Sequence, residues 1–184
     1  MRASPTTQQL SPQLAAIADE LNAVSSGWKS LLAHLSPEKL WKRPAKGGWC
    51  VGECIDHLTI TNREMLPVLD ALLQNAPIGH EPYKMDFSGR LIVWLMEPPY
   101  RMKFKAPTTF APQTSTKDVL SEFLTTQAAA LDALRRCNGV ALDKLKFVSP
   151  ANARMSYNGY AALKLLPTHQ RRHLWQAQQI LKHL

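Results

Sequence analysis

Apolar residues recur along the chain at helical spacing and predict four long helices. The first is the clearest, because a seven-residue repeat of apolar positions continues without a break and charged residues lie between them. The repeat consists of Leu10, Leu14, Ile17, Leu21, Val24, Trp28, Leu31 and Leu35. Ser36-Pro37-Glu38 then predicts the start of a short helical turn that reaches Trp41. Residues 44–49 (Pro-Ala-Lys-Gly-Gly-Trp) are typical of a loop.

Three further helices follow. The second is expected from near Cys50 to about Gln74, with His57 at the edge of its apolar stripe. The third is expected to be capped around residues 114–116, to carry Leu120, Phe123, Leu124, Leu131 and Leu134 inward, and to end at Asn138-Gly139. The fourth runs from about Ser156 to Leu184, and Pro167 predicts a kink in it.

A long, Pro-rich connection separates the second helix from the third. It covers residues 76–114 and is interrupted by the apolar segment 91–96, which we expect to form one short helix. No strand-like alternation competes with the helical pattern. The sequence therefore predicts an all-α four-helix bundle with a long connection between its second and third helices.

Length and composition favour a single domain covering residues 1–184. Apolar residues make up 45% of the chain and charged residues 20%, which is ordinary for a globular protein. Residues 1–9 contain no apolar stretch that resembles a secretion signal, and no apolar run reaches the roughly 20 residues that a bilayer requires. Three cysteines without disulfide-like spacing suit a reducing compartment, so a cytoplasmic location is expected.

The net charge of +8 raises the question of a nucleic-acid partner. The basic residues are scattered among acidic and apolar positions, with small groups at residues 42–46, 101–105 and 171–172. None of these groups alternates with aromatic residues as in a nucleic-acid module. This pattern argues against nucleic-acid binding and favours a small-molecule partner.

Two histidines in the fourth helix have the spacing of metal ligands. His169 and His173 lie one helical turn apart, on a seam that also contains Gln176. The neighbouring seam positions are Ala162, Leu166 and Ile180. Buried polar groups without partners cost about 1–3 kcal/mol each, and one metal ion would satisfy both imidazoles.

His57 is a candidate third ligand, because it lies on another long helix and also faces the bundle interior. Three neutral imidazoles leave a divalent ion with open positions for water or substrate; zinc, nickel and iron all suit such ligands. A zincin protease has Glu directly after the first histidine, whereas this chain has Gln170, which argues against that mechanism.

The cysteines leave a second interpretation open. Cys50 and Cys54 precede His57 at helical spacing, so a closed thiolate–imidazole zinc site is conceivable, although Cys54 also suits a small buried apolar position. Cys137 has no neighbour of interest.

Other polar residues are candidates for supporting roles. Glu53 could accept a hydrogen bond from a ligand imidazole or act as a base, and Asp56 and Gln176 could orient ligands. Arg172 could pair with an acid of the second helix or bind an anionic substrate. Trp49, Trp94 and Trp175 are expected to serve in packing.

Two segments resemble the DinB-like superfamily of metalloenzymes. Residues 48–58 (Gly-Trp-Cys-Val-Gly-Glu-Cys-Ile-Asp-His-Leu) are similar to the segment that opens the family's second helix, Trp-Ser-x-x-Glu-x-x-x-His-Leu. Residues 169–176 (His-Gln-Arg-Arg-His-Leu-Trp-Gln) are similar to its His-x-x-Arg-His-x-x-Gln segment. With the helix pattern, the resemblance spans about Leu10 to Leu184. One departure is Cys50, where the family usually has Ser, a stronger helix cap.

The resemblance implies an up-down-down-up bundle in which His57, His169 and His173 bind one divalent metal. Characterised relatives use the metal to activate a low-molecular-weight thiol, and homodimers are common among them. We therefore expect a metal-dependent transferase that acts on a small thiol, with Arg172 holding the thiol's carboxylate and the 91–96 segment covering the pocket or forming a dimer contact. Two alternatives stay open: a metal-dependent hydrolase with Glu53 as base, and a non-catalytic module stapled by metal.

Overall fold

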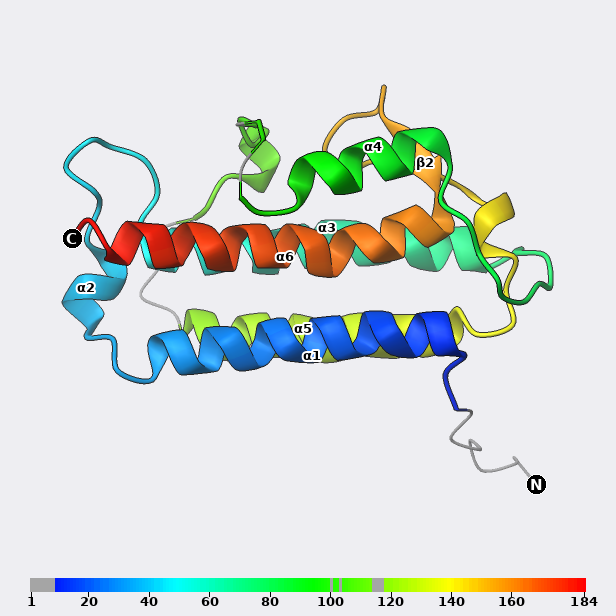
Figure 1. Cartoon of the computed structure of the whole chain (residues 1–184), viewed down its shortest axis with the longest axis horizontal. Helices are drawn as coiled ribbons and strands as arrows, with labels where there is room; N and C mark the ends of the chain where they lie inside the picture. Colours follow the sequence, from blue (N-terminus) through cyan, green and yellow to red (C-terminus); the bar gives the residue numbers. More distant parts are fainter. Residues whose placement is uncertain (1–8, 100, 103, 114–117) are drawn as a thin grey trace.

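Four long helices pack side by side in two layers (Figure 1). The computed structural model describes residues 9–99, 101–102, 104–113 and 118–184. The four helices are α1 (Pro12–Leu32), α3 (Val51–Leu73), α5 (Val119–Arg136) and α6 (Gly159–Leu181). Each of α1 and α3 contacts both α5 and α6. In Figure 1, α1 and α6 run from right to left, whereas α3 and α5 run from left to right. The chain is thus mostly helical, as predicted.

The apolar repeat of the first helix is buried as expected. Leu14, Ile17, Leu21, Val24 and Trp28 all face the core of the bundle. The ends of the repeat lie just outside α1, which begins at Pro12 and ends at Leu32. The predicted short turn is α2 (Pro37–Trp41), and the Ser36 hydroxyl caps it by accepting a hydrogen bond from the Lys39 amide.

The connection between α3 and α5 contains two short helices, α4 (Phe87–Met96) and η1 (Thr108–Phe110). α4 lies outside the bundle along α6 (Figure 1) and begins four residues before the predicted segment. Its N-cap is Asp86, which accepts a hydrogen bond from the Gly89 amide at 2.8 Å. Gly89 also permits close approach to α6, since a Cβ there would lie 2.2 Å from the Ala161 Cβ.

The last two long helices begin later than predicted. The expected cap at residues 114–116 lies outside the described residues, and α5 starts at Val119 behind the cap residue Asp118. The predicted stop at Asn138-Gly139 is confirmed: the helix ends at Arg136, and Gly139 takes a φ of +79° that favours glycine. Pro167 lies inside α6, which continues to Leu181.

The expectation that the chain contains no strands is wrong. β1 (Lys146–Val148) pairs antiparallel with β2 (Ser156–Asn158), so α6 begins at Gly159 rather than near Ser156. Two strands of three residues are too short for an alternating pattern to be visible in the sequence. The hairpin follows η2 (Leu142–Lys144), and Asn158 at its end caps α6 by accepting from the Ala161 amide at 2.9 Å.

A layer of buried polar side chains lies within the bundle. Gln170 of α6 and Gln127 of α5 exchange two hydrogen bonds, of 2.7 and 2.9 Å. Asn62 of α3 donates to Gln127 and accepts from Gln170, and Ser25 of α1 accepts from Gln127. One residue from each long helix thus contributes to a connected network, which favours one alignment of the four helices.

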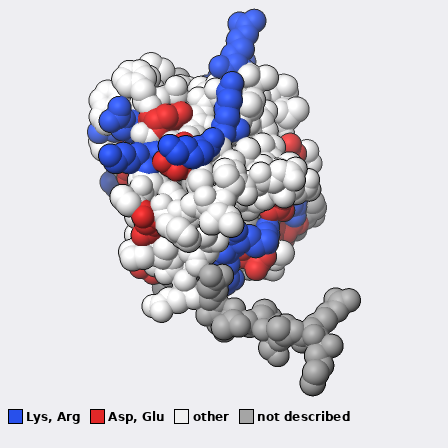
Figure 2. Space-filling view, turned by 90° about the vertical axis from the view of Figure 1, so that its right-hand side faces the viewer, with Lys and Arg blue, Asp and Glu red and all other residues white. Residues whose placement is uncertain are grey.

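Charges of both signs are interspersed at the end of the bundle that lies on the right in Figure 1. On this face, Lys and Arg side chains lie beside Asp and Glu side chains, and most of the surface belongs to other residues (Figure 2). Within the described ranges, no helix has both the length and the apolar character of a membrane span.

Candidate metal centre

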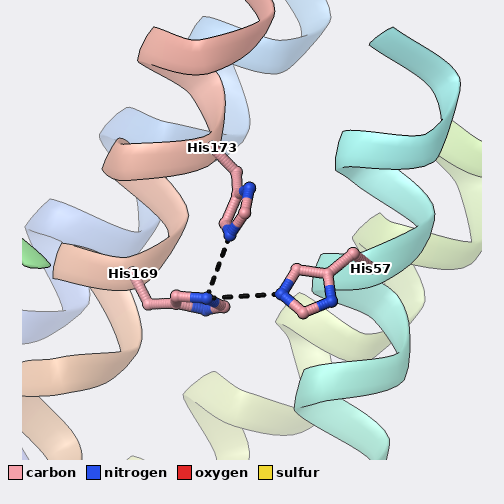
Figure 3. A group of neighbouring side chains, drawn as sticks. All are labelled: His57, His169 and His173. Carbon is pink, nitrogen blue, oxygen red and sulfur yellow. Dashed lines mark hydrogen bonds between the residues drawn. The ribbon is translucent and has the colours of Figure 1, made fainter. Parts of the chain in front are cut away.

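Three histidines from two helices meet inside the bundle. His57 projects from α3, and His169 and His173 project from successive turns of α6 (Figure 3). The Nε2 atom of His169 lies 3.0 Å from that of His173 and 3.4 Å from that of His57. Figure 3 shows all three rings directed toward one another. We call these three residues the histidine cluster.

The spacing of the cluster matches that of ligands on one ion. Two imidazole nitrogens bound about 2.0–2.1 Å from an ion, at tetrahedral or octahedral angles, are roughly 2.9–3.4 Å apart. His57 adds evidence from its other nitrogen, because Nδ1 lies 2.7 Å from the carbonyl oxygen of Phe110. A carbonyl only accepts, so Nδ1 carries the proton and the lone pair of Nε2 faces the centre. The donor set therefore fits a divalent metal.

Burial keeps the imidazoles neutral, which is the form that binds metal. It lowers the pKa of His57, although the hydrogen bond to Phe110 opposes this shift. The pKa values of His169 and His173 lie well below the ordinary value, first because of burial and then because of the neighbouring imidazoles and the Arg172 guanidinium. At neutral pH all three nitrogens are available as ligands.

The Nδ1 atom of His173 differs from that of His57, because no carbonyl group within the described ranges holds it. This atom is buried and makes no hydrogen bond within 3.5 Å among the described residues. Gln176, one turn later on α6, raises the pKa of His173, so its amide is the group placed to turn toward this nitrogen. The supporting role of Gln176 stays a prediction.

Glu53 lies at the start of α3 rather than in the histidine cluster. Its carboxylate accepts a hydrogen bond from the Cys50 amide at 2.8 Å and forms an ion pair with Arg43. The Cys50 Sγ in turn accepts from the Glu53 amide at 3.4 Å, which completes a capping box with sulfur in place of a hydroxyl. Both carboxylate oxygens are therefore engaged at the helix cap.

The cysteines are separate from the histidine cluster. Among the described residues, only one group of three or more His, Cys, Asp or Glu side chains brings its ligand atoms close enough together for a metal ion. This group is the histidine cluster, and it contains no cysteine. Cys54 is fully buried in the apolar core, and burial raises its pKa well above the ordinary value. Burial also raises the pKa of Cys137 to about 12. Cys50 and Cys54 therefore do not converge with His57 on one position, and the structure does not support the closed thiolate–imidazole zinc site.

The remaining candidates have structural partners. Asp56 accepts from the Gln113 amide at 2.7 Å, which holds the segment after η1 against α3. Arg172 is buried and donates to the carbonyls of Leu95 and Met102. Both residues belong to the connection between α3 and α5, which we call the crossover. Gln170, the residue that replaces the zincin glutamate, points into the polar layer of the bundle and is 1% exposed.

A cleft of about 1170 Å³ opens beside the histidine cluster. The loop at residues 44–49, the crossover at 104–110 and the hairpin loop form parts of its wall. All three histidines, Arg172, Trp175 and Gln176 line it, whereas Glu53, Asp56 and both cysteines of α3 do not. Trp94 is exposed on α4.

Sequence reasoning missed two features of the centre. Trp49 was expected to serve only in packing, but its ring lies 4.9 Å from that of His57 and stacks 5.7 Å from that of His173. Its position directly before the helix cap was the available signal. The Phe110 carbonyl, by contrast, is a backbone group 53 residues from His57, and no side-chain pattern could reveal it.

The fold and the centre together define a four-helix-bundle protein with three internal histidines placed so that they could hold one metal ion. A family model described as the DinB superfamily matches residues 5–177. The chain belongs to this superfamily, so the predicted resemblance is confirmed.

One solved structure with the same fold is YfiT from Bacillus subtilis. It is described as a probable metal-dependent hydrolase with an unusual four-helix bundle topology. The match has a TM-score of 0.62 at 15% sequence identity, and it covers 98% of this chain and 93% of YfiT. No curated protein matches the sequence.

Proposed function

We propose that this protein is a metal-dependent hydrolase in which the histidine cluster holds one divalent ion. The convergence of three neutral Nε2 atoms beside a large cleft is the observation that carries the proposal. The description of YfiT as a probable metal-dependent hydrolase supports this reaction class over the thiol transfer that the sequence motifs suggest.

The residues of the centre have distinct roles in this proposal. His57, His169 and His173 would hold the ion, which would keep open positions and would lower the pKa of a water or thiol bound there. The Phe110 carbonyl orients His57, and Trp49 covers the faces of His57 and His173. Arg172 holds the crossover, which forms one wall of the cleft. Glu53 is omitted, because its oxygens are engaged at the helix cap.

Metal binding and hydrolysis can be tested together. We expect about one zinc, nickel or ferrous ion per chain, and metal-dependent cleavage of p-nitrophenyl esters or lactones in thiol-free buffer. The double variant His169→Ala/His173→Ala should lose both properties. His34→Ala/His80→Ala is the matched control, since both of these histidines are exposed and lie outside the cleft. Equal metal-dependent turnover in the two double variants would refute the proposal.

Thiol transfer is a second candidate because, within the described part of the chain, no Asp or Glu lines the cleft. A thiol has an ordinary pKa of about 8.5, against 15.7 for water, so its activation depends less on a nearby base. Activity that appears only when a small thiol such as cysteine is added would favour this candidate. A homodimer and a cytoplasmic location stay predictions, which sedimentation and cell fractionation would test.

A further inference from the structure

From the histidine cluster the cleft extends toward one end of the bundle, where apolar lining residues are interspersed with the polar residues Thr61, Asn62, Ser149 and Asn152. We call the apolar part of this wall the apolar arm. We define this arm by six lining residues: Met65, Ile92, Met96, Met155, Leu165 and Leu166. α3 and α6 run in opposite directions, so Met65, two turns after His57, lies toward the same end of the bundle as Leu165, one turn before His169. Eight residues of helix separate His57 from Met65, which corresponds to about 12 Å.

The composition of the arm suits a flexible hydrocarbon. Three of its six residues are methionines, whose unbranched side chains adapt to ligands of different shape. Met65, Ile92 and Leu166 are largely buried, whereas Met96, Met155 and Leu165 are partly exposed and contribute accessible apolar surface. On the other side of the histidine cluster, Gln176 and Gln179 line the cleft together with Trp175 and Ile180.

The charge of the cleft has a single sign. Among the residues that the structure describes, which include all 14 Asp and Glu residues of the chain, no carboxylate lines the cleft. Its charged lining residues are Lys46, Lys105 and Arg172, of which the two lysines are exposed. Arg172 directly precedes His173 on α6, and both residues line the cleft, so a positive charge lies close to the histidine cluster. A cleft lined by one sign of charge concentrates ligands of the opposite sign.

We propose that the substrate is an amphipathic anion whose hydrocarbon part occupies the apolar arm and whose anionic group lies near Lys46, Lys105 and Arg172. Medium-chain acyl or aryl compounds that carry one carboxylate belong to this class. The inference rests on the proposed function for the chemistry performed, but the binding preference follows from the cleft alone.

Binding of simple probes tests the proposal without turnover. Calorimetry on the full chain, with and without zinc and with the fold checked by circular dichroism, would compare octanoate, octanamide and octylamine. Octanoate should bind at least tenfold more tightly than octanamide, and octylamine should bind most weakly. From butanoate to octanoate, each added methylene should tighten binding by up to about fourfold. Affinity that does not depend on chain length, or equal affinity for octanoate and octanamide, would overturn the proposal.

Two pairs of variants locate the ligand. Lys46→Glu/Lys105→Glu should weaken octanoate at least tenfold and leave octanamide unchanged, whereas the exposed Lys42→Glu, outside the cleft, should do neither. Leu165→Gln should weaken both probes, whereas Leu181→Gln, partly buried on α6 away from the cleft, should not. Equal effects within either pair would place the ligand elsewhere and refute the proposal.

The outcome is separable from that of the proposed function. If the chain hydrolyses no ester but binds octanoate with the expected preferences in the zinc-free form, the proposed reaction fails and the ligand class stands. If it is a metal-dependent hydrolase but shows no preference for the anion, only the ligand class fails.

Discussion

Replacing Gln170 with Glu tests whether the side of α6 that carries Gln170 is buried in the bundle. In a zincin, this position supplies a catalytic carboxylate, whereas here the side chain lies in the polar layer and is 1% exposed. Its Nε2 donates to Gln127 at 2.7 Å and to Asn62 at 3.2 Å. In Gln170→Glu, a carboxylate oxygen would face both acceptors, so the protein should lose stability and should gain no hydrolytic activity.

The cost depends on pH. A protonated Glu can still donate to one acceptor, so at low pH the loss is that of one buried hydrogen bond, about 1–3 kcal/mol. Burial raises the pKa of such a carboxyl in the folded state above its unfolded value of about 4.3. The unfolded state then loses its proton first, and folding weakens by about 1.4 kcal/mol per pH unit until the folded pKa is reached. For a buried carboxyl whose folded pKa lies above 7, the gap to the wild type should widen by about 2.7 kcal/mol between pH 5 and pH 7.

Thermal unfolding followed by circular dichroism measures this gap. For a chain of this size, 2.7 kcal/mol corresponds to a further lowering of Tm by roughly 5–11 °C between pH 5 and pH 7. Gln178→Glu is the matched control, because Gln178 is exposed on the same helix, and its Tm should follow the wild type at both pH values. A Gln170→Glu gap that stays constant with pH would mean that the carboxylate reaches solvent, and the assignment of the faces of α6 would be wrong.

Three further predictions concern the cap, the crossover and the histidine cluster. Glu53→Gln should lower the free energy of unfolding by about 1–2 kcal/mol through the helix cap and the lost ion pair, while zinc affinity measured by competition with a chelator stays within twofold. Gly89→Ala should cost about 1–3 kcal/mol in urea unfolding because its Cβ would clash with Ala161, whereas the exposed Ser88→Ala should be neutral. In the zinc-free protein, the pKa values of the histidine cluster are lower in the folded state than in the unfolded state. As the pH falls below about 6.5, the unfolded state therefore binds protons first, and the free energy of unfolding should decrease. His169→Ala/His173→Ala should reduce this decline, and an unchanged pH profile would contradict the burial of the two imidazoles.

The sequence alone predicted the four long helices and named all three residues of the histidine cluster. Helix periodicity is local, so the buried face of α1 and the end of α5 could be derived from apolar spacing and from Asn138-Gly139. The pairing of His169 with His173 follows from the rise of one helical turn. The third histidine was recognised from its place in a second helix and from the family motif. These inferences need only neighbours within a few residues, or a motif that carries the long-range information.

The tertiary structure decided what each polar side chain contacts. Glu53 lies four residues before His57, and Gln170 directly follows His169, yet Glu53 closes the cap of α3 and Gln170 bonds to side chains of α3 and α5 in the polar layer. Three other features likewise depend on contacts that the sequence pattern does not reveal. They are the Phe110 carbonyl that orients His57, the pairing of the two strands, and the cleft whose charged lining residues are all basic. Periodicity gives the face of a helix that is apolar, but the rotation and alignment of helices against one another, set by packing of the whole core, determine which partner each side chain meets.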